Sequence, residues 1–418
     1  MSLRVFRAEV TMYIVMKKIG FMKKRVFVIG LILISLITGC NKEEEQEFIK
    51  GVDVSSILAQ EESGVIYRNK SKEPQDIFQT LSEVGINYVR IRIWNDPYDE
   101  DGQGYGGGNC DLEKAVQIGR RATKYGMKVF VDFHYSDFWA DPGKQMAPKA
   151  WNDMELDEKE KALKEYTYDC LNEFYQQGIK VGMVQIGNEI NNGLCGETNW
   201  ESIATLLHAG SQAVRDMDSD TRIVVHFTDI HKDNDGWFAE QLKKYKVNYD
   251  VFATSYYSYW HGTVEHMSEQ LSKIADTYNK EVLVAETAYC YTLEDTDYFG
   301  NTISEQNQEL LQYEVSVDGQ TKAILDVVNA IQQIGDAGLG VFYWEPAWIT
   351  VGQQSYTENE QLWNKYGSGW ASKYCGDYDT EDGGLYYGGS SWDNQALFDV
   401  TGCPLSSLYE FGNKIGIN

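Results

Sequence analysis

The stretches Gly182-Met-Val-Gln-Ile-Gly-Asn-Glu189 and Glu281-Val-Leu-Val-Ala-Glu286 indicate the fold of this chain most directly. Each is a short run rich in β-branched and apolar residues, as in a strand buried on both faces, and each ends in a glutamate. If they are the fourth and seventh strands of a parallel barrel, both carboxylates reach the same mouth. A hydrolase that works with a pair of carboxylates is therefore the leading hypothesis.

Six further runs of the same character bring the expected strands to eight, at 51–54, 88–94, 128–134, 222–227, 250–255 and 340–345. Segments with helical spacing lie between them, and several end in a glycine that is typical of a helix C-cap: Gly126, Gly178 and Gly338. This alternation predicts an α/β (β/α)8 TIM barrel, a single domain with long loops after its strands. An open doubly wound sheet is the alternative, but no Gly-x-Gly-x-x-Gly follows the first strand.

The N-terminus predicts export and a lipid anchor. Met22-Lys-Lys-Arg25 is a basic region, Val26 to Thr38 is an apolar run of 13 residues, and Ile37-Thr-Gly-Cys40 resembles the lipobox of bacterial lipoproteins. We expect a signal peptide at 1–39, a lipidated acidic tether at 40–49 and a catalytic domain at 50–418, on the outer membrane or cell surface of a Gram-negative bacterium. The alternative is an ordinary secretory signal that leaves Cys40 as a spare thiol.

Charge and cysteines limit the partners of the mature chain. Loss of residues 1–39 leaves 30 basic and 62 acidic residues, a net charge of −32, which disfavours nucleic acid and anionic lipid as partners. An exported chain can form disulfides, but we predict no bridge, and no spacing matches a zinc site. The remaining thiols are Cys110, Cys170, Cys195, Cys290, Cys375 and Cys403.

The two strand-end glutamates suit glycosidic bond cleavage, in which one carboxyl group protonates the departing oxygen and the other attacks or activates water. Val282, Val284 and Glu286 share one parity, so valines that fill the barrel core would direct the glutamate into the mouth. A single glutamate of this kind can also be a salt-bridged rim residue. Asn188 beside Glu189 strengthens the catalytic interpretation, since its amide can bind a sugar hydroxyl, although using both neighbours requires the backbone to leave strand geometry there.

Seven motifs support a more specific interpretation: Gly51-Val-Asp-Val-Ser-Ser56, Val89-Arg-Ile-Arg-Ile-Trp-Asn-Asp-Pro97, Asp132-Phe-His-Tyr-Ser-Asp-Phe-Trp-Ala-Asp-Pro142, Gln185-Ile-Gly-Asn-Glu-Ile190, Ser255-Tyr-Tyr257 with Trp260-His-Gly262, Glu286-Thr-Ala-Tyr289, and Gly389-Ser-Ser-Trp-Asp-Asn-Gln-Ala-Leu-Phe-Asp399. Together they resemble glycoside hydrolase family 53, the endo-β-1,4-galactanases among the clan A barrels, from Gly51 to Phe411. The resemblance implies that Glu189 is the general acid/base and Glu286 the nucleophile of a retaining reaction on galactan or type I arabinogalactan side chains of pectin. We expect a monomer without a catalytic cofactor.

These roles lead to expectations about neighbouring side chains. An ionised nucleophile needs a cation, for which we choose Arg92, although an arginine here could instead pair with Asp53. Of Tyr256 and Tyr257, we expect Tyr256 to donate a hydrogen bond to the nucleophile. Further expected substrate-binding residues are His134, Asp137, Trp139, Asn188 and Trp344. For His134, a substrate or a neighbouring carboxylate is favoured over zinc as the partner.

Eight tryptophans lie at or beyond the expected strand ends, and flat sugar faces pack on aromatic rings. A single tryptophan more often packs within a loop, but eight together predict a cleft that binds several sugars: Trp94, Trp139, Trp260, Trp344, Trp348, Trp363, Trp370 and Trp392.

A structural Ca²⁺ site is expected in the loop after the seventh strand, where acidic and amide side chains alternate. The resemblance implies that the loop after the eighth strand assists and that Phe299 contributes only its carbonyl. The expected ligands are Asp295, Asp297, Asn301, Ser390 and Asp393. The alternative is a solvated acidic loop.

Two other functions remain open at this point. Another clan A glycanase, acting on mannan or cellulose, would share both glutamates and differ in its loops. A non-catalytic surface lipoprotein that binds glycans would need neither glutamate.

Overall fold

The structure, a computed structural model, describes residues 47–352 and 354–413. The expected signal peptide, Cys40 and nearly all of the tether lie outside the described residues. The chain divides into two units, Met1–Glu47 and Phe48–Asn418, and all described strands and helices belong to the second. This boundary lies two residues before the expected start of the catalytic domain at residue 50.

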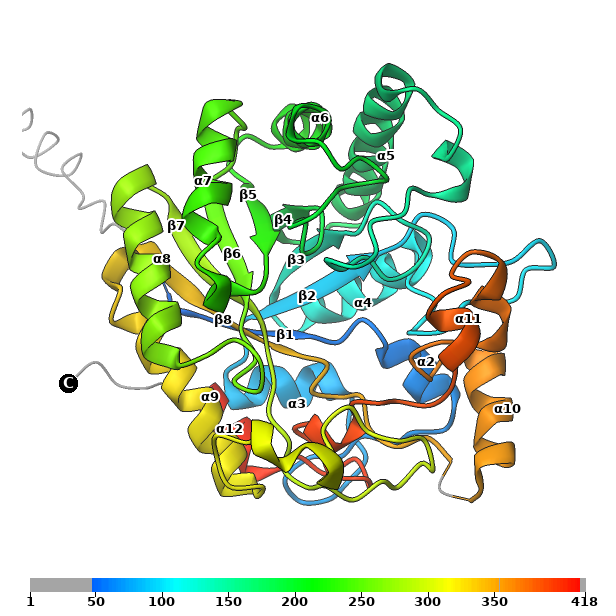
Figure 1. Cartoon of the computed structure of the whole chain (residues 1–418). Helices are drawn as coiled ribbons and strands as arrows, with labels where there is room; N and C mark the ends of the chain where they lie inside the picture. The colour runs from blue at the N-terminus through cyan, green and yellow to red at the C-terminus, as the bar shows by residue number, and fades with distance from the viewer. Residues whose placement is uncertain (1–46, 353, 414–418) are drawn as a thin grey trace, which may run out of the picture. The chain divides into compact units, whose positions relative to one another are not determined.

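Eight parallel strands form a closed barrel in chain order, with β8 pairing back onto β1 (Figure 1). The predicted (β/α)8 barrel is therefore confirmed. The strands are β1 (Ile49–Asp53), β2 (Tyr88–Ile93), β3 (Lys128–Phe133), β4 (Val181–Ile186), β5 (Arg222–Phe227), β6 (Val251–Ser255), β7 (Glu281–Thr287) and β8 (Gly338–Trp344).

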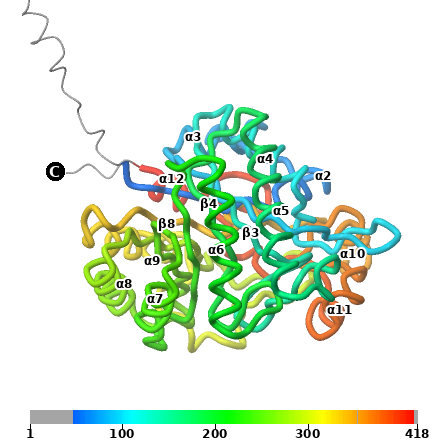
Figure 2. Tube along the Cα trace, turned by 90° about the horizontal axis from the view of Figure 1, so that it is seen from above, coloured from blue at the N-terminus to red at the C-terminus, as the bar shows by residue number. Residues whose placement is uncertain are grey.

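Helices surround the strands (Figures 1 and 2). The α-helices are α2 (Ile57–Glu62), α3 (Ile77–Val84), α4 (Leu112–Lys124), α5 (Leu156–Gln176), α6 (Trp200–Met217), α7 (Asp235–Lys244), α8 (Val264–Tyr278), α9 (Val317–Gln332), α10 (Tyr356–Tyr366), α11 (Gly383–Tyr386) and α12 (Ser406–Gly412). Short 3-10 turns are η1 (Lys149–Trp151), η2 (Ile230–Lys232), η3 (Glu305–Leu310), η4 (Gly335–Ala337), η5 (Lys373–Asp377) and η6 (Asp393–Gln395).

Local sequence explains where several helices begin and end. Asp111 accepts a hydrogen bond from the Lys114 amide at the start of α4, which satisfies an otherwise unpaired helix donor. Gly126 and Gly178 follow α4 and α5 with φ of +87° and +69°, as their expected C-cap role requires. The expectation for Gly338 is wrong, because Gly335 takes the left-handed turn after α9 and Gly338 begins β8.

The side chains of the strands pack into two layers. The barrel interior is filled by a cluster that includes Leu283 and Ala285 of β7, whereas Val282 and Val284 pack in the larger cluster shared with the helices. The expectation that these valines fill the barrel interior is therefore wrong. Glu286 nevertheless reaches the mouth, for a reason found in the strand pairing.

A β-bulge turns Glu286 toward the barrel axis. Thr254 of β6 pairs with Val284, but the next residue, Ser255, pairs with Glu286, so Ala285 is an extra residue on β7. One inserted residue reverses the alternation of side chains between the two faces of a strand. Glu286 therefore shares a face with Ser255 and lies at the carboxyl end of the barrel.

Within 47–352 and 354–413 no helix combines the length and apolar character needed to cross a membrane. The cysteines in these residues are all free and buried: Cys110, Cys170, Cys195, Cys290, Cys375 and Cys403.

Candidate active site

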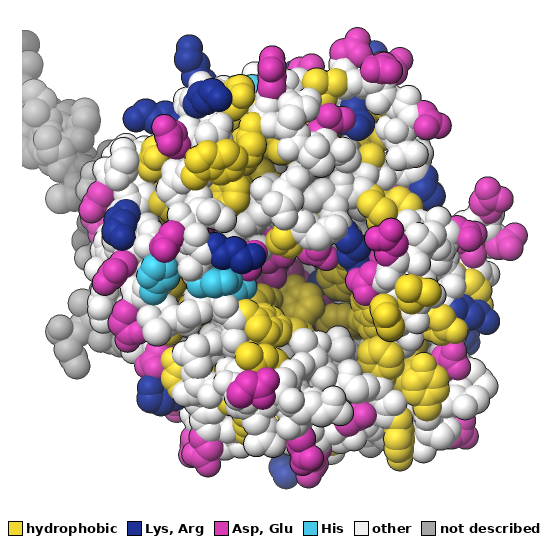
Figure 3. Space-filling model, in the orientation of Figure 1, with side chains coloured by type: hydrophobic (Ala, Val, Ile, Leu, Met, Phe, Trp, Pro, Cys, Tyr) yellow, Lys and Arg dark blue, Asp and Glu magenta, His cyan; other side chains and the backbone are white. Residues whose placement is uncertain are grey.

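The carboxyl ends of the strands surround a pocket of about 300 Å³ that opens to solvent. Figure 3 shows it as a hollow in the face of the molecule, with hydrophobic side chains in and around it and acidic ones at its margin. Glu189 and Glu286 both line this pocket, from β4 and β7 respectively. The two glutamates that are 97 positions apart in sequence therefore face one cavity.

The backbone after β4 leaves strand geometry, as the expected use of two adjacent side chains requires. The strand ends at Ile186, and Gly187 and Glu189 have φ of +108° and +47°. A Cβ on Gly187 would lie 2.7 Å from side-chain atoms of Ile190 and Leu194, so no larger residue fits there. The turn lets both Asn188 and Glu189 line the pocket.

Two donors hold the carboxylate of Glu286, and neither is the one chosen from the sequence. Arg90 Nη1 lies 2.7 Å from Glu286 Oε1, and the Tyr257 hydroxyl donates to Oε2 at 3.0 Å. The choice of Tyr256 is wrong, because its hydroxyl donates instead to the carbonyl of Gly262 at 2.9 Å.

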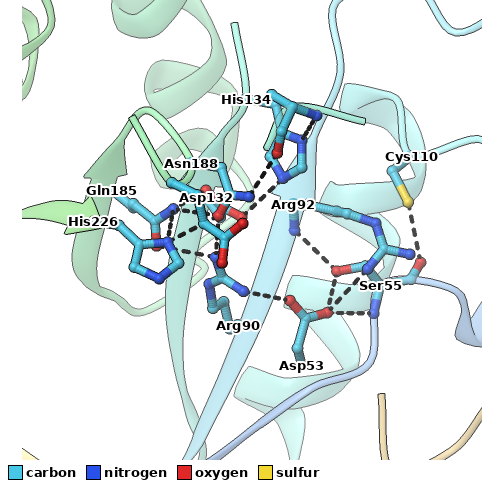
Figure 4. Close-up of polar contacts among 12 residues, drawn as sticks. Asp53, Ser55, Arg90, Arg92, Cys110, Asp132, His134, Gln185, Asn188 and His226 are labelled. Atoms are coloured by element: carbon cyan, nitrogen blue, oxygen red, sulfur yellow. Dashed lines mark hydrogen bonds and ion pairs between the residues drawn. The ribbon is translucent and has the colours of Figure 1, made fainter. Parts of the chain in front are cut away.

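Arg92 also has other partners than expected. Its Nη1 lies 2.6 Å from Glu345 Oε1 and 3.5 Å from Asp53 Oδ1, and its guanidinium stacks 4.4 Å from the Trp139 ring centre. The alternative pairing with Asp53 is thus present, but the closer partner is Glu345. In Figure 4, Arg90 points toward Asn188 and Gln185, while Arg92 lies with Ser55 and Cys110.

A buried network connects Asn188 to Glu189 through two residues that the sequence interpretation missed. Arg90 Nη2 donates to Asn188 Oδ1 at 2.9 Å, and His226 Nδ1 lies 2.9 Å from the same oxygen. His226 Nε2 contacts the Ser255 hydroxyl at 3.0 Å, which donates to Glu189 Oε1 at 2.6 Å. The position of His226 in the apolar run of β5 was the available signal, because a polar residue in a buried strand needs a partner.

The environments of the two glutamates differ in charge. Burial in the pocket wall raises the pKa of Glu189 to about 8, and the negative charge of Glu286 adds to this. Burial also raises the pKa of Glu286, but there the positive charge of Arg90 acts in the opposite direction. The positive charge of Arg90 therefore favours the anionic form of Glu286, whereas burial and the charge of Glu286 both favour the protonated form of Glu189.

Arg90 is the central cation of the site. Burial disfavours its charge, but Asp132, Glu286 and Asp53 outweigh this effect, so the pKa of Arg90 is raised. Its ion pairs measure 2.8 Å to Asp132 and 3.1 Å to Asp53. Because all four groups are almost fully buried, the arginine is fixed in both position and charge.

His134 and Asp137, two expected substrate-binding residues, differ in where they lie. His134 lines the pocket, and its Nε2 lies 3.2 Å from Asp132 Oδ2, in agreement with the carboxylate partner favoured from the sequence. The carboxylate of Asp137 instead accepts hydrogen bonds from the amides of Asp96 and Lys149, and it is not part of the pocket wall. Asp137 organises its loop.

Six of the eight tryptophans line the pocket: Trp139, Trp260, Trp344, Trp348, Trp370 and Trp392. Trp94 and Trp363 are buried elsewhere, so the expectation holds for six. Trp344 ends β8 and packs edge-on against Trp392 at 5.0 Å, while Trp139 and Trp348 stack at 6.3 Å. These rings offer flat apolar surfaces on the wall of a pocket that also contains two carboxylates.

The side chains expected to bind Ca²⁺ lie in a second, separate acidic region. Asp297 is buried, and its carboxylate accepts hydrogen bonds from the amides of Phe299 and Ser390. Asp393 Oδ2 accepts one from the hydroxyl of Thr350 at 2.7 Å. Burial raises the pKa of Asp297 to about 8 and that of Asp393 to about 6.

Comparison with known proteins agrees with this fold. The family model for Glycosyl hydrolase family 53 matches residues 49–411. Endo-beta-1,4-galactanase from Bacillus subtilis is 52% identical over 91% of this chain and 88% of its own length. Arabinogalactan endo-beta-1,4-galactanase from Cellvibrio japonicus is 33% identical over 91% of this chain and 94% of its own.

Among solved structures, the GH53 catalytic domain of Ignisphaera aggregans superimposes with a TM-score of 0.78 at 38% identity, covering 87% of this chain and 95% of that one. The closed barrel and the two glutamates in one pocket define the framework of a (β/α)8 glycosidase. The chain belongs to glycoside hydrolase family 53.

Proposed function

We propose that this protein is a retaining endo-β-1,4-galactanase that cleaves the galactan side chains of pectin, including type I arabinogalactan. The observation that carries the proposal is the pair Glu189 and Glu286 in one pocket, with Arg90 at only one of them. Membership of family 53 and the printed names of the relatives, endo-beta-1,4-galactanase in particular, support this substrate.

In the first step, a carboxylate oxygen of Glu286 attacks the anomeric carbon and forms an ester bond to the sugar. The glycosidic carbon–oxygen bond breaks, and the proton of Glu189 passes to the departing oxygen. In the second step, Glu189 takes a proton from a water molecule as that water attacks the same carbon, which breaks the ester and releases Glu286. Two inversions retain the configuration.

The surroundings of each glutamate suit these roles. A pKa of about 8 keeps Glu189 protonated at neutral pH, as a general acid must be. When Glu286 becomes an ester, its negative charge is lost and the pKa of Glu189 falls, so that the same group becomes a base. Arg90 and Tyr257 stabilise Glu286 as an anion before attack and again as it leaves.

Substrate binding is assigned to the pocket wall. Trp139 and Trp344 offer faces on which galactose can stack, and His134 offers a ring held by Asp132. Asn188 is positioned by Arg90 and by its donation to the Ala140 carbonyl at 2.8 Å, so it meets a sugar hydroxyl without reorienting. Arg92 stacks on Trp139 and so supports this wall. It does not contact the proposed nucleophile, Glu286.

Hydrolysis assays separate the competing functions. We expect reducing sugar to be released from potato galactan, with internal cuts that lower viscosity early, and little release from mannan or cellulose. Preference for mannan or cellulose would favour another clan A glycanase. Binding of galactan without any release would favour a non-catalytic glycan-binding protein, which would need neither Glu189 nor Glu286.

We further propose that a structural Ca²⁺ ion binds between the loops after β7 and β8. The donor set fits a hard cation, because Asp393 Oδ1 and Asn301 Oδ1 are buried oxygens without hydrogen-bond partners among the described residues. Asp297, Asp393 and Asn301 would hold the ion, with Asp295 and Ser390 completing the set. Its charge would ionise the two buried acids and pin the loops together, with no part in bond cleavage.

Export and lipid anchoring complete the proposal. The lipobox-like Ile37-Thr-Gly-Cys40 supports cleavage before Cys40 and acylation of its thiol. Mass spectrometry of the cell-associated protein tests this, and a Cys40→Ser variant should be released into the soluble fraction.

The enzyme is expected to act as a monomer without a catalytic cofactor, and size-exclusion chromatography with light scattering checks the mass.

A further inference from the structure

Three metal-binding side chains meet outside the proposed catalytic machinery. Asp229 and His231 belong to the loop after β5, and His261 belongs to the loop after β6. Their ligand atoms lie within 4.8 Å of one another, and among residues 47–352 and 354–413 no other group of three acidic, histidine or cysteine side chains converges in this way. Figure 3 shows histidines beside a basic side chain near the rim of the hollow.

The spacing of these side chains suits a small cation. The rings of His231 and His261 are nearly parallel, with planes 10° apart and centres 5.7 Å apart. His261 Nε2 lies 3.9 Å from Asp229 Oδ1. Ligand atoms about 2 Å from a tetrahedral Zn²⁺ lie about 3.3 Å from each other. A contraction of less than an ångström would bring this pair to that separation.

His261 is held with one ring nitrogen toward Asp229. Its Nδ1 accepts a hydrogen bond from the amide of Tyr257 at 3.1 Å, and Nε2 is the ring nitrogen that faces Asp229. In the neutral ring the proton is therefore on Nε2, and a metal ion that binds at Nε2 displaces this proton.

The local charge also favours a cation. Lys232 Nζ lies 2.6 Å from Asp229 Oδ2, which leaves Oδ1 to face His261. Asp235 is buried nearby, and neither of its carboxylate oxygens has a hydrogen-bond partner outside its own residue. Burial raises the pKa of Asp235 to about 7, and the negative charges of Asp233 and Asp229 raise it further. The negative charges of Asp229 and Asp233 outnumber the single positive charge of Lys232 in this loop, whereas the raised pKa keeps much of Asp235 neutral.

We propose that Asp229, His231 and His261 bind a late first-row divalent transition-metal ion, best matched by Zn²⁺. The two imidazoles are borderline ligands that favour zinc over calcium or magnesium, and three protein ligands leave a position for water. The ion would join the loops after β5 and β6. It would lie one turn from Tyr257, whose carbonyl accepts the His261 amide at 2.9 Å and whose hydroxyl holds Glu286.

Zinc binding to the purified, metal-free protein tests the site. Competition with a chromogenic chelator measures the affinity, in buffer with saturating Ca²⁺ so that the separate oxygen-ligand site is filled. We expect one Zn²⁺ per chain in the micromolar range, and a loss of at least about tenfold in affinity for His231→Ala and for Asp229→Asn. His208→Ala, on α6, is the matched control and should bind as the wild type does.

His231 and Asp229 carry the test because each is partly exposed, whereas substitution of the buried His261 can also disturb the fold. Circular dichroism checks the fold of each variant. Co²⁺ in place of Zn²⁺ should give the visible absorption of a nitrogen–oxygen site, which His231→Ala abolishes. No binding up to millimolar Zn²⁺, or equal affinity in the wild type and in His231→Ala, would overturn the proposal, and neither result bears on galactan cleavage.

Discussion

Two pairs of carboxylates lie at the carboxyl end of this barrel, and they differ in their cations. Glu189 and Glu286 share their pocket with Arg90, which contacts one of the two. Asp297 and Asp393 are held by hydroxyl and amide groups, with burial raising both pKa values. A fixed cation at one member separates an acid from an anion, as catalysis needs. A pair of carboxylates without a fixed cation is suited to binding a metal ion.

Removal of the proposed nucleophile should have the largest effect. Glu286→Ala is expected to lower kcat on galactan by about 10⁴-fold or more, because no ester can form. Azide, which can enter the space left by the carboxylate, should partly restore turnover of an activated aryl galactoside. Glu269→Gln, an exposed glutamate on α8, is the control. Unchanged turnover in Glu286→Ala would remove this residue as nucleophile.

The two arginines of β2 provide a matched pair of substitutions. Arg90→Lys is expected to lower kcat by about 10²-fold, because the bond to Glu286 depends on the position of the guanidinium. The lysine ammonium lies farther from Glu286 than the guanidinium does, so the pKa of Glu286 rises. The acidic limb of the pH profile of kcat/KM therefore moves to higher pH. Arg92→Lys, whose partner is Glu345, should affect thermal stability without moving that limb. Equal pH profiles for both variants would contradict the assignment.

Calcium removal should lower stability more than activity. Without the ion, the pKa of Asp297 is about 8 in the folded chain, above its ordinary value of 3.8, so the folded state binds more protons between these values. Stability in a chelator should therefore fall as pH rises toward 8, and the gain in Tm on adding Ca²⁺ should grow over the same range. Differential scanning calorimetry measures both. Asp297→Asn should lose most of the Ca²⁺ response, and an unchanged response would contradict the site.

The smallest expected effect concerns the hydroxyl that contacts Glu189. Ser255 donates to Glu189 Oε1 and so stabilises the ionised form, which lowers the pKa of Glu189. Ser255→Ala removes this hydrogen bond and should raise the pKa of Glu189. The basic limb of the pH profile of kcat/KM should therefore move to higher pH by less than about one unit, with kcat changed by only a few fold. Ser258→Ala, in the loop after β6, is the control. A basic limb that moves to lower pH would contradict this arrangement.

The fold was predictable because each strand and helix carries a local signal. Apolar runs alternate with helical segments and glycine stops, and the parallel barrel is the arrangement that buries all of them. The two glutamates followed from the same pattern, since residues that end barrel strands gather at one face. Their roles came from the resemblance to family 53.

The partners of Glu286 were not predictable in the same way. Arg90 and Arg92 differ by two positions on β2, and Tyr256 and Tyr257 by one, so strand position does not distinguish them. The choice depends on the bulge at Ala285, which shifts Glu286 against its neighbours and brings Arg90 and Tyr257 within reach. A bulge has no reliable signal in a run such as Val-Leu-Val-Ala-Glu.

The sequence by itself determined the barrel, the family and the identity of the two acids, because these depend on residue type and on periodicity along the chain. Only the tertiary structure decided which arginine and which tyrosine meet Glu286, that Asp137 supports a loop rather than the pocket, and that Asp229, His231 and His261 converge. Such contacts join segments that are distant along the chain, and the small register shifts and turns that bring them together depend on packing in three dimensions.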